Sequence, residues 1–172
     1  MKDFFEILNS RVSVKSYLDT PVEKQQLQQI VEAGMHAPTG RNKQSPIILA
    51  VTNKTLRDKL SALNAKILGT DTDPFYNAPC VLVVLADKSV NTRVYDGSVV
   101  MENMLLAAHA LGLGACWIHR ARETFETEEG KQILKELGIE GEYEGIGNCV
   151  VGHAKITPSV KPRKENWVYY VE

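Results

Sequence analysis

Residues 98–119 read SVVMENMLLAAHALGLGACWIH, an apolar helix pattern that passes through two glycines into a strand-like segment. Apolar side chains fall on almost every side of a helix over residues 98–111, as is typical of a helix buried in a domain or shared between two subunits. Gly112 and Gly114 form only part of a GxGxxG motif, because Trp117 stands where the third glycine belongs. A helix rather than a strand also precedes them, so this segment argues against a Rossmann fold.

The segments around this helix do not alternate as regular βαβ units. Start signals predict a short helix after Asp3 and a second one after Thr20, where Pro21 and Glu23 complete a capping box. Amphipathic stripes predict further helices around residues 56–67 and 127–137. Branched residues bounded by Gly, Pro or Asn predict strands at residues 46–52, 80–86, 115–119, 148–153 and 167–171. The irregular order predicts an α+β sandwich, formed as one domain over residues 1–172.

Composition excludes several classes of protein. The net charge of -1 over 172 residues gives no electrostatic case for binding nucleic acid or an anionic membrane. No apolar run approaches the roughly 18 residues of a membrane span, and residues 1–4 carry no signal-peptide pattern. Cys80, Cys116 and Cys149 lie in apolar surroundings, which predicts reduced core thiols in a cytoplasmic protein.

Residues 11–17 form the first candidate binding segment. In an extended chain Arg11, Ser13 and Lys15 share one side, and Val12 and Val14 share the other. A guanidinium, a hydroxyl and an ammonium on one side suit a phosphate with a second electron-rich group nearby. The same alternation is also typical of a solvated edge strand.

Residues 36–46 form a second candidate, a loop shaped by Pro38, Gly40 and Pro46. Asn42 and Gln44 offer both donors and acceptors, which suits a heterocycle with mixed C=O and N–H edges, although an exposed polar loop would have the same composition.

Two further features carry weaker signals. Lys161 and Arg163 flank Pro162 near the C-terminus and could supply a second arm to a phosphate site, or simply form a basic solvated tail. Cys116 and His119 are three residues apart, but no second pair has ligand spacing, so we expect no metal site.

Taken in order, these segments resemble the nitroreductase family over nearly the whole chain. The resemblance rests on Arg11-x-Ser13-x-Lys15, the loop from Ala37 to Gln44, Asn77-Ala78-Pro79, the 102–108 helix with its following glycines, Val151-Gly152-His153 and Lys161-x-Arg163. It implies a three-layer sandwich with a mostly antiparallel central sheet, and an intertwined homodimer with FMN sites at the subunit interface. It also implies a ping-pong oxidoreductase that passes a hydride from NADH or NADPH through FMN to a nitroaromatic or quinone-like acceptor.

The resemblance assigns roles to individual residues. Arg11 and Ser13, joined by Lys161 and Arg163, would hold the FMN phosphate, and Lys15 would lie near the pyrimidine edge of the flavin. Val12 would also contact the cofactor. Pro38, Thr39 and Asn42 would come from the partner subunit. One face of the ring would be lined by Trp117, Ile118, His119 and Arg120.

Because the flavin carries the chemistry, the resemblance requires no separate catalytic residue. Two positions depart from the family pattern: Lys15 stands where many members have Arg, and Arg120 stands where a small Gly is common. The alternatives are other flavin chemistry on the same fold, such as reductive dehalogenation, flavin cleavage or metabolite dehydrogenation, and a non-catalytic FMN-binding module.

Overall fold

A four-stranded antiparallel sheet forms the centre of the protein in the computed structural model, which describes residues 3–172. The strand order is β1-β2-β4-β3, with β1 at Pro46–Val51, β2 at Cys80–Asp87, β4 at Tyr143–Gly152 and β3 at Gly114–Ile118. The register pairs Pro46 with Ala86, Cys80 with Val151 and Ile118 with Asn148. All three pairings are antiparallel, which excludes the parallel sheet of a Rossmann fold.

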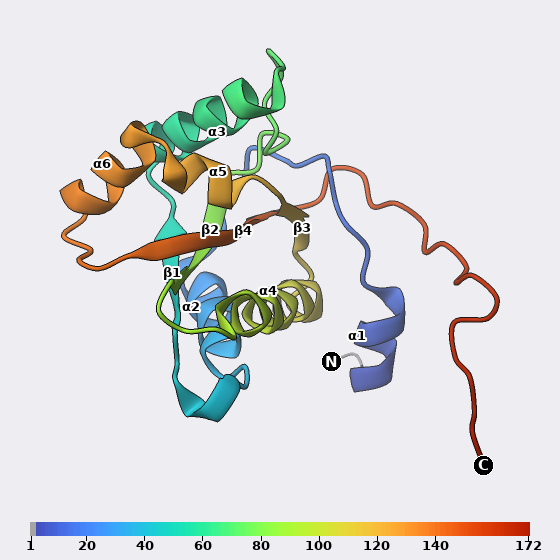
Figure 1. Ribbon diagram of the computed structural model, residues 1–172. Helices are drawn as coiled ribbons and strands as arrows, with labels where there is room; N and C mark the ends of the chain where they lie inside the picture. The colour runs from blue at the N-terminus through green and yellow to red at the C-terminus, as the bar shows by residue number, and fades with distance from the viewer. Residues whose placement is uncertain (1–2) are drawn as a thin grey trace.

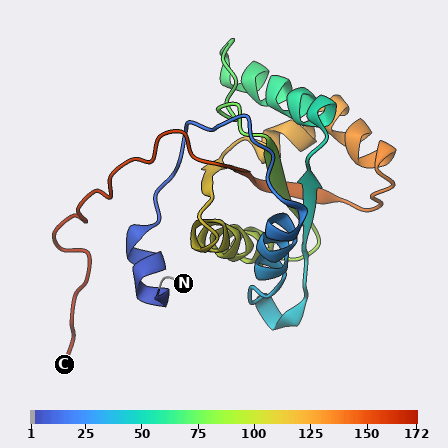
Figure 2. The same cartoon turned by 180° about the vertical axis from the view of Figure 1, so that it is seen from behind.

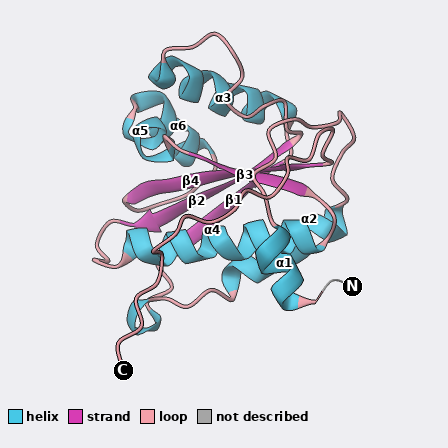
Figure 3. Ribbon diagram, turned by 90° about the vertical axis from the view of Figure 1, so that its right-hand side faces the viewer, coloured by secondary structure: helices cyan, strands magenta, loops and turns pink. Residues whose placement is uncertain are grey.

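Helices cover both faces of this sheet (Figures 1 and 3). One face carries α3 (Lys54–Leu68), α5 (Ala121–Glu126) and α6 (Glu128–Glu136); the other carries α2 (Lys24–Met35) and α4 (Arg93–Ala110), with α1 (Phe4–Ser10) beside α4. A separate buried hydrophobic cluster fills the space on each side of the sheet. The predicted α+β sandwich is therefore confirmed.

The apolar segment at residues 98–111 corresponds to α4, which packs Met101 and Met104 fully buried against the sheet. The helix begins earlier than predicted, at Arg93, where Thr92 Oγ1 donates to Asp96 at 2.9 Å. After Leu111 the chain reverses through Gly112, whose φ of +76° suits glycine, and enters β3. The glycines of the incomplete GxGxxG motif thus serve a helix-to-strand turn.

Several predicted boundaries are wrong. The second helix begins at Lys24 with Glu23 as N-cap and without a side-chain cap, so the capping box at Thr20 does not form. Asp3 does occupy the N-cap position of α1, but its side chain makes no cap hydrogen bond. β4 starts at Tyr143, five residues before the predicted strand.

The glycines of β4 explain why its first half was missed. A Cβ at Gly145 would lie 2.2 Å from the Ala121 carbonyl oxygen, and one at Gly147 would lie 2.6 Å from Trp117 Nε1. These positions need glycine because α5 and an indole ring press directly on the strand. They consequently lack the branched residues that signal a strand in sequence.

The C-terminal segment departs most from expectation. The predicted strand at residues 167–171 does not form; beyond β4 the chain makes one isolated bridge, between Tyr17 and Ala154, and then continues without regular structure. Figures 1 and 2 show this tail leaving the body on the side that carries α1. Trp167 is 66% exposed, Tyr170 88% and Val171 95%. A strand needs a neighbour for its backbone hydrogen bonds, and within one chain this segment meets none.

Across residues 3–172, no helix combines the length and apolar character that crossing a lipid bilayer requires.

Candidate functional site

Residues 11–17 run beside β3 and place the first predicted binding group. Ser13 forms a parallel bridge with Ala115, and the Val14 N–H donates to the Ala115 carbonyl at 3.0 Å. Val14 is buried against Gly114, whereas Ser13 and Lys15 are exposed. The predicted alternation of faces is confirmed for residues 13–15, and it turns Ser13 and Lys15 away from the core.

One nitrogen of the Arg11 guanidinium, Nη1, is buried and has no hydrogen-bond partner among the described residues. Burial raises the pKa of the neighbouring Cys116 thiol, against the opposing effects of a Ser13 hydrogen bond and the charges of Lys15 and Arg11. Ser13 and the two cations therefore lie near Cys116 of β3. A buried guanidinium nitrogen without a partner is costly unless an anion meets it.

Lys15 also contacts an aromatic ring, with its Nζ atom 5.7 Å from the centre of the Tyr76 ring. Tyr76 and Asn77 both have positive φ, and Asp73 holds their turn by accepting the Asn77 N–H at 2.7 Å. Sequence reasoning used Asn77 only as part of the resemblance and did not find Tyr76.

The end of β3 and the two residues after it form the second part of the site. The rings of Trp117 and His119 lie 6.1 Å apart on one side of the chain. Trp117 Nε1 is buried, and none of residues 3–172 provides it with a hydrogen-bond partner. A Cβ at Gly147 would lie 2.6 Å from this nitrogen, so the donor faces β4.

Two buried amides hold the turn at His119 and Arg120. Asn64 Nδ2 donates to the His119 carbonyl at 2.8 Å, and Asn148 Nδ2 donates to the same carbonyl at 3.3 Å. Arg120 adopts the left-handed region, with φ 72° and ψ 13°, and its Nε donates to Asn64 Oδ1 at 3.0 Å. Sequence reasoning missed Asn64 and Asn148. Their only signal was a polar residue within an otherwise apolar helix stripe or strand.

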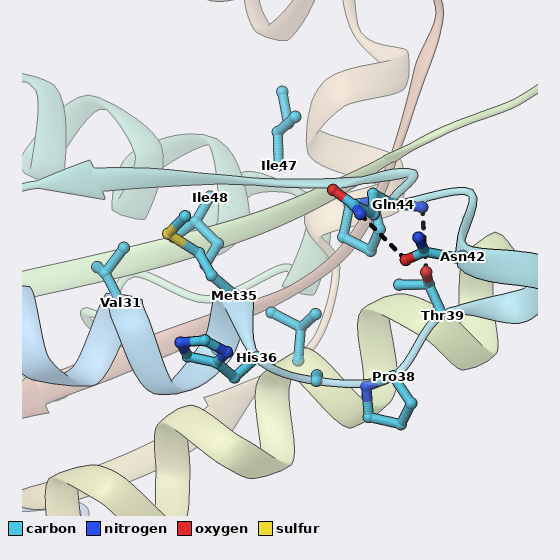
Figure 4. A pocket seen from close by; sticks show the side chains of 13 residues that line it. Val31, Met35, His36, Pro38, Thr39, Asn42, Gln44, Ile47 and Ile48 are labelled. Carbon is cyan, nitrogen blue, oxygen red and sulfur yellow. Dashed lines mark hydrogen bonds between the residues drawn. The ribbon is translucent and has the colours of Figure 1, made fainter.

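The loop at residues 36–46 lines a cavity of about 630 Å³ (Figure 4). Gln44 closes the loop, because its backbone N–H donates to Thr39 Oγ1 at 3.1 Å and its side chain donates to Asn42 Oδ1 at 3.0 Å. The buried Asp96 of α4 anchors the loop by accepting the Gly40 N–H at 2.9 Å. The cavity has a polar wall from this loop and an apolar wall that includes Val31, Met35, Ile47, Ile48 and Val100.

The predicted site residues fall into separated groups. The 36–46 loop precedes β1, whereas Arg11, Lys15 and Trp117–Arg120 lie at β3, and these strands form opposite edges of the sheet. Three strand spacings separate the edges by about 14 Å. Pro38, Thr39 and Asn42 therefore do not meet the β3 group within one chain. Lys161 and Arg163 lie on the exposed tail and make no hydrogen bond or ion pair with the described residues.

Comparison with known proteins identifies the family of this fold. The sequence model of the nitroreductase family matches residues 8–153. The chain belongs to the nitroreductase family. The match spans every predicted site residue except Lys161 and Arg163, which follow it in the chain.

Individual members of the nitroreductase family are distant in sequence but close in structure. An FMN reductase [NAD(P)H] from Bacillus subtilis is 27% identical over 180 residues, covering 95% of this chain and 70% of the relative. An FMN-dependent nitroreductase from Clostridium difficile R20291 has a TM-score of 0.82 at 26% identity, covering 98% of this chain and 99% of the other. A nitroreductase with bound FMN from Bacteroides fragilis shares the fold, with a TM-score of 0.91 at 24% identity and 100% coverage of both chains.

Proposed function

We propose that this protein binds FMN and transfers electrons from NADH or NADPH to an organic acceptor such as a nitroaromatic or a quinone. The observation that carries the proposal is the buried, unpartnered Nη1 atom of Arg11, at the start of the segment that places Ser13 and Lys15 beside β3. A phosphate would satisfy this guanidinium with charge-assisted hydrogen bonds. The names of the relatives, an FMN reductase and an FMN-dependent nitroreductase, support the same cofactor.

Different residues would bind different parts of the cofactor. Arg11 and Ser13 would bind the phosphate, together with the Val12 backbone, and Lys15 would lie at the pyrimidine edge, where a cation stabilises negative charge on a reduced ring. Trp117, Ile118, His119 and Arg120 would line one face of the ring. When bound, FMN supplies the group that accepts a hydride from NAD(P)H and donates it to the acceptor.

The active form in this proposal is a homodimer. Thr39 and Asn42 lie too far from Arg11 in one chain, so a second copy must present its 36–46 loop if both groups are to contact one flavin. The exposed tail, with Trp167, Tyr170 and Val171, also supports an intertwined partner. Such a tail could carry Lys161 and Arg163 toward the phosphate of a shared site.

An absorbance spectrum of the purified protein between about 300 and 550 nm tests the proposal, because bound flavin has two bands in that range. We expect both bands to bleach on anaerobic addition of NADH or NADPH and to return when menadione or nitrofurazone is added. A colourless protein that cannot be reconstituted with FMN would refute the cofactor assignment. A flavin that neither dinucleotide reduces would leave an FMN-binding module without this activity.

A further inference from the structure

Three cations lie at the β3 edge without an acidic partner. Arg11, Lys15 and Arg120 form none of the ion pairs found within residues 3–172. The proposed cofactor accounts for two of them, since Arg11 meets the phosphate and Lys15 meets the pyrimidine edge. Arg120 is proposed to line one face of the flavin ring, but no ligand is assigned to the end of its side chain.

The conformation of Arg120 suits glycine better than arginine. At φ 72° any residue with a Cβ is disfavoured, yet this chain has a long cationic side chain there. Asn64, which is fully buried, binds Arg120 Nε and at the same time anchors the His119 carbonyl. The side chain is therefore held in place rather than simply solvated.

The rest of the guanidinium remains available. Neither Nη group of Arg120 has a hydrogen-bond or ion-pair partner within residues 3–172. A guanidinium fixed through Nε presents two adjacent donors in one plane, which matches the two oxygens of a carboxylate. Arg120 is itself one of the residues proposed to line the flavin ring, so we expect these donors to lie beside the place where an acceptor must sit.

We propose that the Arg120 side chain binds a carboxylate carried by the aromatic acceptor and selects acidic acceptors over neutral ones. The inference rests on the proposed function and names the substrate class of that site. The phosphate that distinguishes NADPH from NADH is a second source of the same oxyanion chemistry. The experiment below separates the two.

Two matched acceptors test the selection: para-nitrobenzoate and para-nitrobenzamide share ring and nitro group and differ in charge. In the holoenzyme, Arg120→Gly should lower the ratio of kcat/KM for the acid to that for the amide about tenfold, because a charge-assisted pair is lost. Arg120→Lys keeps the charge and should retain most of the ratio. Arg122→Ala removes a nearby exposed arginine that pairs with Glu126 and should leave the ratio unchanged.

A binding measurement without turnover supplies the second readout. Benzoate and benzamide are titrated into the oxidised holoenzyme and followed by the flavin absorbance. We expect the Kd of benzoate to rise about tenfold in Arg120→Gly while the Kd of benzamide stays nearly constant. Thermal unfolding of this variant controls for folding, and glycine suits the local backbone.

Two results would overturn the inference. The acid and the amide could change by the same factor, which would mean that Arg120 acts on the flavin or the fold. Alternatively, only the KM for NADPH could rise, which would assign Arg120 to the dinucleotide. Failure of the proposed function itself would be visible earlier, as a wild-type protein that binds no FMN.

Discussion

Arg11 combines a structural cost with a proposed binding role. Its buried Nη1 atom lacks a partner in the described chain, and an unsatisfied buried donor costs about 1–3 kcal/mol. Arg11→Met should raise the Kd for FMN by about tenfold to a hundredfold, because the phosphate loses a charge-assisted pair. The same change should leave the apoprotein as stable as the wild type or more so. Fluorescence titration with FMN and thermal unfolding of the apoprotein measure the two effects.

Lys59→Met, on the exposed side of α3, provides the matched control and should change neither quantity. A clearly destabilised Arg11→Met apoprotein would show that Arg11 serves folding rather than an anion.

The buried Cys80 thiol should make the free energy of unfolding depend on pH. Burial raises the pKa of this thiol to about 12, whereas a thiol in the unfolded chain has a pKa of about 8.5. Between these values the unfolded state loses the proton and the folded state keeps it, so the free energy of unfolding falls as pH rises. The fall from one such thiol approaches about 1.4 kcal/mol per pH unit. Its contribution is fully present below about pH 8.5 and is lost as pH rises toward 12.

Urea unfolding under reducing conditions from pH 8 to 10.5 measures this effect. Cys80→Ala should be less stable overall because a core side chain is truncated, yet its stability should decline less steeply with pH. Parallel pH profiles of the variant and the wild type would show that Cys80 is not protected in the native state.

At the scale of elements, the contact between α5 and β4 sets the position of the turn that carries Arg120. A Cβ at Gly145 would lie 2.2 Å from the Ala121 carbonyl oxygen, so Gly145→Ala must push α5 away from the strand. We expect a loss of about 1–3 kcal/mol in the free energy of unfolding, and weaker FMN binding because the turn at His119 moves. Denaturant unfolding and FMN titration measure the two losses.

Gly112→Ala is the comparison, because Gly112 has positive φ and its added Cβ would meet nothing within 4 Å. It should cost only the backbone strain, about 1 kcal/mol, and leave FMN affinity nearly unchanged. Equal losses of affinity in the two variants would contradict the role assigned to the α5–β4 contact.

At the scale of the whole molecule, the separation of the two sheet edges makes the site testable by mixing subunits. Arg11→Met disables the half of the FMN site at β3. The double variant Thr39→Ala/Asn42→Ala disables the half formed by the 36–46 loop. If one flavin takes its halves from two chains, a heterodimer of these variants contains one intact site and one doubly altered site. With random pairing, half of the dimers are mixed, and about a quarter of all sites recover.

Tightly bound FMN per dimer after co-expression measures this recovery. Absence of recovery in mixed dimers of confirmed composition would show that each site is built within one chain.

A chain truncated after Ala154 lacks the exposed tail, and we expect it to sediment as a monomer with little FMN.

Much of the fold was predictable because local patterns agreed with it. Apolar periodicity located α3, α4 and α6, and branched segments located β1, β2 and β3. Thr127 was recognisable as a cap and accepts the Gly130 N–H at 3.0 Å. The start of β4 was not predictable, because Gly145 and Gly147 are required by close contacts with residues distant in sequence. Asn64 and Asn148 were missed for the same reason, since their partners lie 55 and 29 residues away.

The sequence by itself determined the α+β class, the alternation that exposes Ser13 and Lys15, and the family to which the chain belongs. These properties depend on spacing along the chain. Only the tertiary structure decided that the Nη1 atom of Arg11 is buried without a partner among residues 3–172, that Arg120 is held by Asn64, and that the 36–46 loop lies at the sheet edge opposite β3. Each of these depends on which strands pair and which helices cover them, and strand pairing joins residues whose separation in sequence carries no local signal.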